Sequence, residues 1–487
     1  MYFGQYSFVQ KSVSFQKHSS RKVQISKNIR PEKCNFYFVF VQKSVILQKI
    51  NFMYRRIINS LTDWKLRNKR KPLILLGARQ VGKTYIVKKF GQESFRNFIY
   101  INCHQNTVAN ELFRDMDTSR IRREIERLYD KKIDDGETLI FFDEIQEVAN
   151  GVASLKYFCE NEPNLHVIVA GSLLGITLKE GESYPVGKVE TLRMYPMDFM
   201  EFLIARERKG LVVMLENLEW DTMKLADKDL TEYLREYYFT GGMPEAVQEY
   251  ISSGDVHKVR KIQMDIIDAY NRDIAKHTKT MSTRIHQVWE SIPAQLAKEN
   301  KKFVYGAIAK SARASQFELA LQWLQDAGLI YKVDLVKKTT MPLKFYADAS
   351  AFKVFFLDCG LLACMSETNP NEMLLGDNAF VEFKGAFTEN FVIEQIKSLD
   401  QIPVFYYAKE NSQLEIDFVI QTDRVIPMEV KAEENTKSKS LSTFVRIDNA
   451  DSGMKGLRVS MKPYIDQGWM ENIPLYSLWC YLNKKVQ

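Results

Sequence analysis

The sequence predicts an α/β protein with a parallel sheet first, then a helical region, then a second, smaller α/β domain. Three patterns lead to this prediction: short apolar runs alternate with helical stretches in the first half, residues 211–300 are mostly helical, and strands return near the C-terminus. The chain has 487 residues. At ~150 residues per domain, that length suggests about three domains.

The composition limits the class of protein. Apolar residues make up 45% and charged residues 26% of the chain, which are ordinary globular values that exclude wholesale disorder, collagen-like repeats and a disulfide-stapled miniprotein. The longest apolar runs are far short of the ~20 residues that a membrane span needs, so we expect no membrane partner. Six scattered cysteines without a C-x-x-C pair make a zinc site improbable and favour a reducing, cytoplasmic location.

The positive net charge of +7 is concentrated at the N-terminus. Residues 1–52 hold seven lysines and two arginines against one acid, a sum of +8, so the rest of the chain sums to −1. The segment also repeats itself, because Phe8–Val13 returns as Phe40–Val45. It can be a nucleic-acid-binding arm, a targeting segment, or translated upstream sequence with Met53 as the natural start. We favour the third interpretation and expect residues 1–52 to be disordered or not native.

A glycine-rich motif follows the first predicted strand. The apolar run Leu73–Leu76 leads into a match to G-x-x-x-x-G-K-[ST], and a helix follows. The glycines let backbone N–H groups point at phosphate oxygens, and the helix start adds its positive dipole end. Lys83 should reach the β- and γ-phosphates, and the Thr84 hydroxyl should bind Mg²⁺. The candidate nucleotide-binding residues of this motif are Gly77, Ala78, Arg79, Gln80, Val81, Gly82, Lys83 and Thr84.

Two further strands carry candidate catalytic residues of the same domain, which we assign to residues 53–210. The run that starts at Thr138 ends in Asp143 and Glu144. We expect Asp143 to contribute to nucleotide and Mg²⁺ binding, and Glu144 to orient or deprotonate the attacking water. The run that starts at His166 ends in Ser172, a candidate sensor of the γ-phosphate. The ligand should sit at the carboxyl ends of these parallel strands.

A winged-helix pattern follows the helical region. Helical stretches over 303–313 and 315–327 precede two predicted strands, 329–335 and 343–347, and we assign residues 301–350 to a winged-helix-like module. Such a module can place its second helix in a DNA major groove, or can serve as a packing module. Because the second helix is not notably basic, the packing role is favoured.

The last predicted domain, residues 376–487, carries a carboxylate–lysine pattern. Asp417 lies in one predicted strand, and Glu429 and Lys431 lie on one face of the next. This is the D–E-x-K arrangement of restriction-type nucleases, in which two carboxylates hold a divalent metal that activates water. Lys431 is the candidate that orients the water. The motif is short, and a buried cluster of lysine and carboxylates is the alternative interpretation.

Seven segments together resemble a known group of proteins. Beyond residue 52, the chain is similar to the bacterial and archaeal AAA-superfamily ATPases that carry a C-terminal restriction-endonuclease-like domain of unknown function. The matching segments are 77–84, 141–146, 170–173, 185–190, 195–202, 241–247 and 270–276. The Tyr-Pro-Met segment at 195 and the Gly-Gly-Met-Pro segment at 241 are the more particular ones.

The resemblance implies ATP as the nucleotide and a basic residue after the sensor strand. Lys188 and Arg193 are the candidates that neutralise phosphate charge, in the same chain or across an interface of a homo-oligomer. The resemblance also suggests Glu389 as a further metal ligand.

Three functions remain open at this point. The first is an ATPase that drives a nuclease-like domain acting on DNA or another nucleic acid. The second is a nucleotide-controlled switch or scaffold that binds protein partners without cutting. The third is a chaperone-like machine acting on protein. The carboxylate–lysine pattern favours the first, and the near-neutral body of the chain counts against it.

Overall fold

The structure is a computed structural model that describes most of the chain after residue 52. The described residues are 53–104, 108–172, 174–177, 185–298, 301–310, 312–375, 378–409, 414–432 and 438–486. The repeated basic segment 1–52 and the predicted start of the last domain at residue 376 lie outside them. Within the described part, no helix combines the length and apolar character needed to cross a bilayer.

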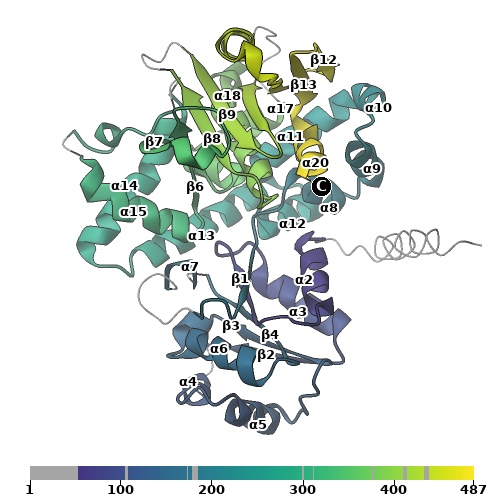
Figure 1. The fold of residues 1–487 in the computed structure, drawn as a ribbon, viewed down its shortest axis with the longest axis vertical. Helices are drawn as coiled ribbons and strands as arrows, with labels where there is room; N and C mark the ends of the chain where they lie inside the picture. Colours follow the sequence, from purple (N-terminus) through teal and green to yellow (C-terminus); the bar gives the residue numbers. More distant parts are fainter. Residues whose placement is uncertain are drawn as a thin grey trace, which may run out of the picture. The chain divides into compact units, whose positions relative to one another are not determined.

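The first sheet is parallel, as predicted, and β5 adds a fifth strand that the sequence did not indicate; the strand order is β2-β3-β4-β1-β5 (Figure 1). Its central strands are buried along their whole length, because helices cover both faces. The strands are β1 (Leu73–Leu76), β2 (Asn97–Asn102), β3 (Thr138–Asp143), β4 (His166–Ala170) and β5 (Glu190–Arg193). The helices and turns of this part are α2 (Ile57–Leu66), α3 (Lys83–Ser94), α4 (Ala109–Leu112), α5 (Thr118–Tyr129), η1 (Ile145–Glu147), α6 (Gly151–Asn161) and α7 (Leu174–Thr177).

A run of helices follows, which confirms the predicted helical region. Aspartate side chains start two of them: Asp198 accepts a hydrogen bond from Glu201 N, and Asp255 accepts from His257 N and Lys258 N. The helices are α8 (Phe199–Ala205), α9 (Lys209–Asn217), α10 (Trp220–Leu225), α11 (Asp227–Thr240), α12 (Pro244–Ser253), α13 (Val256–Ile274) and α14 (Lys279–Leu296).

The region predicted as a winged helix is built differently. Among the described residues of 303–313, the stretch predicted as its first helix, the structure has only the short 3-10 turn η2 (Tyr305–Ala307). The helix α15 (Ala314–Asp326) packs against α14 instead. The stretch 343–347, predicted as a strand, is mostly the 3-10 turn η3 (Leu343–Tyr346). The strand β7 (Ala347–Phe356) begins where the predicted strand ends.

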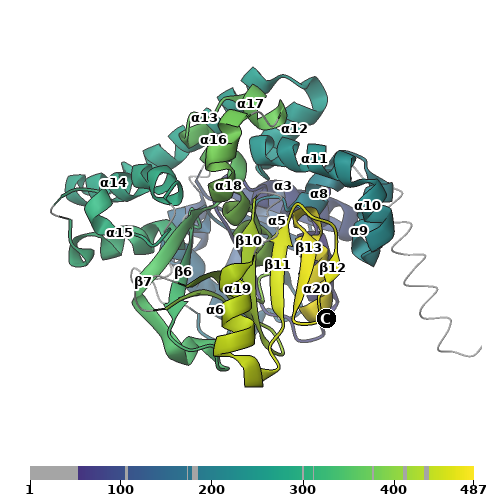
Figure 2. The same ribbon diagram turned by 90° about the horizontal axis from the view of Figure 1, so that it is seen from above.

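The first predicted wing strand and the strand β7 belong to the C-terminal sheet. The strand β6 (Ile330–Val336) pairs with β7 on one side and with β8 (Val404–Ala408) on the other. The resulting eight-stranded sheet has the order β12-β13-β11-β10-β9-β8-β6-β7. Figure 2 labels β6, β7 and β10 to β13, and Figure 1 labels β8 and β9. It therefore crosses the predicted boundaries at residues 350 and 376. An isolated two-stranded ribbon is only marginally stable in water, and pairing with β8 gives β6 a second neighbour.

The other strands of this sheet are β9 (Glu415–Gln421), β10 (Val425–Lys431), β11 (Gly456–Ser460), β12 (Ile465–Asp466) and β13 (Met470–Pro474). Its helices and turns are α16 (Cys359–Met365), α17 (Pro370–Leu375), α18 (Asn378–Lys397), α19 (Lys439–Thr443), the π-helical η4 (Phe444–Asp448), η5 (Ala450–Ser452), η6 (Leu475–Ser477) and α20 (Leu478–Val486). The helix α18 packs on β10, and α20 packs on α18.

Candidate nucleotide-binding site

The glycine-rich motif forms a tight loop between β1 and α3. Gly82 has a φ of 96°, a conformation that glycine adopts without a steric penalty. A Cβ at Gly77 would lie 2.3 Å from the carbonyl oxygen of Met194, so only glycine fits there. Lys83 Nζ donates hydrogen bonds to the carbonyl oxygens of Gly77 and Ala78, each at 2.8 Å. The ammonium is thus held at the loop, and burial lowers its pKa to about 8.

A cavity of about 510 Å³ lies against this loop. Residues far apart in sequence line it: the loop itself, Met53 and Arg55 before α2, Glu144, Ser172, and the first turns of α12. Its size is within the usual range for small-molecule and cofactor sites. The α12 residues that line it are Pro244, Glu245 and Gln248.

Thr84 and Asp143 meet at the floor of the site. The Thr84 hydroxyl donates to Asp143 Oδ2 at 2.7 Å, and the Tyr100 hydroxyl donates to the same oxygen at 3.3 Å. Burial raises the pKa of Asp143. A hydroxyl and a carboxylate side by side are hard oxygen donors of the kind that Mg²⁺ prefers, so this pair fits the predicted metal.

Glu144 and Ser172 also meet, as their places after neighbouring strands imply. Glu144 Oε2 accepts hydrogen bonds from the Ser172 backbone N–H at 3.1 Å and from its hydroxyl at 3.3 Å. Gln146 Nε2 donates to the same oxygen at 2.6 Å. Glu144 has a φ of 53°, an uncommon backbone conformation for a residue with a side chain. Three donors therefore fix one carboxylate oxygen at the edge of the cavity.

The two predicted basic residues lie elsewhere. Lys188 Nζ forms an ion pair with Glu160 at 2.9 Å, and Lys188 does not line the nucleotide cavity. Arg193 ends β5 and lines a different cavity. Neither residue lines the nucleotide cavity of its own chain, although Arg193 pairs with Leu76 of β1, directly before the glycine-rich loop.

Helix α13 holds the glycine-rich loop from outside. Both Asp273 carboxylate oxygens accept hydrogen bonds from Arg79 NH1 at 2.8 Å, and the Tyr270 hydroxyl donates to the Arg79 carbonyl at 2.9 Å. The segment 270–276 is part of the resemblance to the ATPase family, but its sequence assigns no role to Tyr270 or Asp273. The only available signal was the particular sequence Tyr-Asn-Arg-Asp of that segment.

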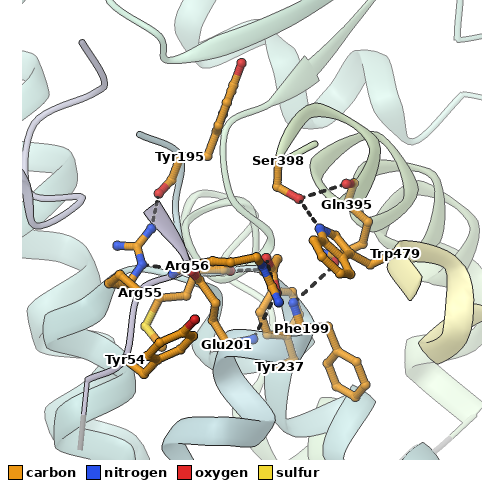
Figure 3. Close-up of polar contacts among 12 residues, drawn as sticks. Tyr54, Arg55, Arg56, Tyr195, Phe199, Glu201, Tyr237, Gln395, Ser398 and Trp479 are labelled. Carbon is orange, nitrogen blue, oxygen red and sulfur yellow. Dashed lines mark hydrogen bonds and ion pairs between the residues drawn. The ribbon is translucent and has the colours of Figure 1, made fainter. Parts of the chain in front are cut away.

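Arg55 is a second residue that sequence reasoning missed. Its guanidinium donates to the Val81 carbonyl at 2.6 Å, to Glu201 Oε2 at 3.0 Å and to the Tyr195 carbonyl at 2.5 Å (Figure 3). It thereby joins the glycine-rich loop, the segment after β5 and α8. Sequence alone offered no signal, since its partners lie up to 146 residues away.

The neighbouring Arg56 connects this junction to the C-terminal helix. Its guanidinium donates to both carboxylate oxygens of Asp198 at 2.8 Å, and its Cζ lies 3.7 Å from the ring centroid of Trp479 on α20. The Trp479 indole N–H in turn donates to Ser398 Oγ at 3.0 Å, as Figure 3 shows. Arg56, at the start of α2, therefore contacts both the segment before α8 and the C-terminal helix α20.

The glycine pair before α12 connects the nucleotide cavity to α16. The Gly242 N–H donates to Asp358 Oδ2 at 2.6 Å, and the Met197 N–H donates to the Gly242 carbonyl at 2.7 Å. A Cβ at Gly241 would lie 2.1 Å from Asp358 Oδ1, and one at Gly242 would lie 2.1 Å from the Met197 carbonyl. These close approaches explain why both positions are glycine.

The predicted carboxylate–lysine residues occupy the second sheet and α18. Asp417 Oδ2 accepts a hydrogen bond from the Val430 N–H at 2.8 Å, and Lys431 Nζ forms an ion pair with Glu429 at 3.1 Å. Burial, reinforced by the charge of Glu389, raises the pKa of Asp417 to about 7. One oxygen each of Glu389 and Glu429 is buried without a hydrogen-bond partner.

Two further lysines enter this cluster, which sequence reasoning did not include. Lys301 forms an ion pair with Glu389, and the fully buried Lys353 forms one with Glu415. Within the described ranges, no group of three or more His, Cys, Asp or Glu residues is placed to hold a metal ion. The expected set of Glu389, Asp417 and Glu429 does not form such a group among the described residues, and Lys301 and Lys353 pair with carboxylates of this cluster.

A comparison with protein-family models agrees with the structure of the domain that contains the glycine-rich loop. Residues 69–203 match the family model of an AAA domain. Residues 231–372 and 384–481 match two models described only as domains of unknown function, DUF8612 and DUF4143. No curated protein matches the chain.

Several solved structures are similar to the chain at low identity. The Walker-type ATPase PABY2304 of Pyrococcus abyssi is 16% identical, with a TM-score of 0.42, over 64% of this chain and 96% of that one. The Aeropyrum pernix ORC1 protein in complex with DNA is 14% identical, with a TM-score of 0.27, over 64% and 91%. Cdc6p from Pyrobaculum aerophilum is 14% identical, with a TM-score of 0.21, over 67% and 93%.

The TM-scores are all below 0.5, so the assignment depends on the family model and on the geometry of the glycine-rich loop. Both lead to the same conclusion. Residues 69–203 carry an AAA-type P-loop ATPase domain.

Proposed function

We propose that this protein hydrolyses ATP with Mg²⁺ in the cavity beside the P-loop. The observation that carries the proposal is a pair of contacts beside the cavity: Thr84, which lines it, binds Asp143, and Glu144 and Ser172, which also line it, bind each other. The first pair supplies oxygen ligands, and the second supplies a carboxylate beside a γ-phosphate sensor.

Each residue has a distinct task in this proposal. Lys83 leaves the carbonyls of Gly77 and Ala78 and binds the β- and γ-phosphates. Thr84 and Asp143 hold Mg²⁺, which neutralises phosphate charge when bound. Glu144 orients the attacking water and accepts its proton, since its second carboxylate oxygen is not the one that Ser172 and Gln146 bind.

The cycle of ATP binding and hydrolysis is proposed to act on the C-terminal domain. Helix α12 lines the nucleotide cavity and begins directly after the glycine pair, whose Gly242 N–H binds Asp358 at the start of α16. A shift of α12 upon nucleotide binding would therefore be transmitted to α16, which packs on α18. Glu389 of the carboxylate–lysine cluster lies on that helix.

A metal-dependent action on nucleic acid is the candidate role of this cluster. The unpartnered buried oxygens of Glu389 and Glu429 favour it, because buried carboxylate oxygens normally have a partner. Lys431 would then orient the attacking water. The ion pairs of Lys301 and Lys353 favour the second candidate, a nucleotide-controlled switch that binds partners without cutting. In that case the lysines neutralise a structural cluster.

ATP turnover by the chain and two variants tests the first proposal. We expect Lys83→Ala to lose nucleotide binding, and Glu144→Gln to keep ATP binding but to lose turnover by about 10²-fold or more. Lys344→Ala, which removes an exposed cation outside the cavity, is the control and should hydrolyse ATP normally. Undiminished hydrolysis by both Lys83→Ala and Glu144→Gln would refute the site assignment.

The two candidate roles of the C-terminal cluster are separated by cleavage assays. Single-stranded DNA, double-stranded DNA and RNA are incubated with Mg²⁺ or Mn²⁺, with and without ATP. Metal-dependent cleavage that Asp417→Asn and Lys431→Ala abolish supports the nuclease role. If no substrate is cut, the switch remains, and its ATP-dependent affinity for nucleic acid is measured against salt concentration.

A further inference from the structure

A second cavity lies against the P-loop and shares no lining residue with the nucleotide cavity. It has a volume of about 300 Å³. Gly77 and Ala78 form one wall, the segment after β5 forms another, and the turn between α15 and β6 closes it together with the end of α18. The same two loop residues accept the hydrogen bonds of Lys83.

The charge of this cavity is positive. Arg193, Lys332 and Lys397 line it, against a single acid, Asp326. Lys332 forms an ion pair with Asp334 at 2.9 Å. In the part of the chain that the structure describes, the side chains of Arg193 and Lys397 form neither an ion pair nor a hydrogen bond. Burial lowers the pKa of Lys397, although the nearby carboxylates of Asp400 and Asp334 act in the opposite direction.

A guanidinium and an ammonium without a direct ion-pair partner suit a phosphate group. A guanidinium binds phosphate through two parallel N–H donors, and an ammonium adds a point charge. The cavity volume is at the lower end of the range for small-molecule sites, which suits a ligand of the size of diphosphate or a nucleoside monophosphate.

We propose that this second cavity is an effector site for a small phosphate-bearing anion. Its occupant contacts the backbone of Gly77 and Ala78, so its binding changes how firmly these carbonyls hold Lys83. Gly328 in the α15–β6 turn lies next to Ala78, since a Cβ at Gly328 would be 3.5 Å from Ala78 N. An anion that draws this turn inward therefore presses on the P-loop. The binding claim stands independently of ATP hydrolysis.

The test measures calorimetric binding of inorganic diphosphate while a saturating, non-hydrolysable ATP analogue fills the nucleotide cavity. We expect one diphosphate per chain, with affinity that falls as salt rises. Arg193→Ala and Lys397→Met should each weaken binding by about 10-fold or more, the usual effect of losing a hydrogen bond to a charged group. Lys344→Ala, which removes an exposed cation outside the cavity, should bind normally.

A second arm separates this site from the P-loop and identifies the ligand class. In Lys83→Ala without nucleotide, diphosphate should still bind, and Arg193→Ala added to it should abolish binding. AMP in place of diphosphate tests whether the ligand is a nucleotide or a free anion. Binding that the ATP analogue abolishes, or that both cavity variants leave unchanged, would overturn the proposal. Melting temperatures of the variants confirm that they are folded.

Discussion

The Gly242 N–H donates a 2.6 Å hydrogen bond to Asp358, across 116 residues of sequence. Asp358 also accepts a hydrogen bond from the Leu361 N–H at 2.9 Å, which begins α16. Burial raises the pKa of Asp358 to about 6, although these donors oppose the shift. One carboxylate therefore joins the segment that leads into the nucleotide cavity to the helix that leads into the C-terminal domain.

Substituting Gly242 should break this connection. In Gly242→Ala, the new methyl group meets the Met197 carbonyl at 2.1 Å, so the segment must move. We expect a loss of about 1–3 kcal/mol or more in the free energy of unfolding, measured by urea titration. Gly210→Ala is the matched control, because nothing lies within 4 Å of its new Cβ. Equal stability of Gly242→Ala and Gly210→Ala would contradict a tight contact between Gly242 and the Met197 carbonyl.

The affinity for ATP should fall as pH rises through about 8. The pKa of Lys83 is lowered to about 8 by burial, so the ammonium that binds phosphates is progressively lost above that pH. Fluorescent-nucleotide titrations from pH 6.5 to 9.5 measure the effect. Lys83→Arg is the control, since its guanidinium stays charged and its affinity should change little over this range. A flat profile for the unmodified chain would be evidence against this pKa.

Removing Arg55 should destabilise the protein strongly. In Arg55→Met, the buried Glu201 loses its partner, and the cost of breaking a buried ion pair is about 3–5 kcal/mol. Adding Glu201→Gln should restore part of the stability, because it removes the uncompensated charge. The exposed pair of Arg67 with Glu190 is the comparison, and Arg67→Met should cost at most about 1 kcal/mol. Similar losses of stability in Arg55→Met and Arg67→Met would contradict a stabilising buried ion pair between Arg55 and Glu201.

The stability of the first domain should decline as pH falls from 6.5 toward 4. Burial, together with the charge of Arg70, lowers the pKa of His166 to about 4, below its value of 6.5 in an unfolded chain. Between pH 6.5 and about 4, His166 is therefore protonated in the unfolded chain but neutral in the folded protein. Because the unfolded state binds the additional proton, unfolding becomes more favourable as the pH falls below 6.5. Urea midpoints at pH 7 and pH 5 measure the decline. We expect a smaller difference in His166→Asn, which has no such titration.

The sequence predicts the first domain well because its signals are local. The P-loop, the acids after β3 and the serine after β4 each follow a buried strand, and parallel strands bring their carboxyl ends to one edge. The approach of Glu144 to Ser172 follows from this rule alone. Contacts such as Arg55 with Val81 follow no such rule, since they depend on how distant segments pack.

The second half is harder to predict for the same reason. The sequence indicates strands β6, β8, β9 and β10 but not which strands pair, and a local helix–strand pattern suggests a separate module at 301–350. The pairing of β6 with β8 depends on contacts about 70 residues apart. Lys301 and Lys353 form ion pairs with carboxylates that are far away in the sequence, and no sequence motif predicts these pairs.

The position of β6 in the sheet also determines which C-terminal fragments can be expressed without an exposed sheet edge. A fragment that begins after residue 376 would keep β8 but lose its neighbour β6, leaving the backbone N–H and C=O groups along one side of β8 unpaired. Such an open edge is a template for pairing with other chains. The C-terminal domain expressed in this way should self-associate, whereas a fragment that starts before β6 keeps the edge covered.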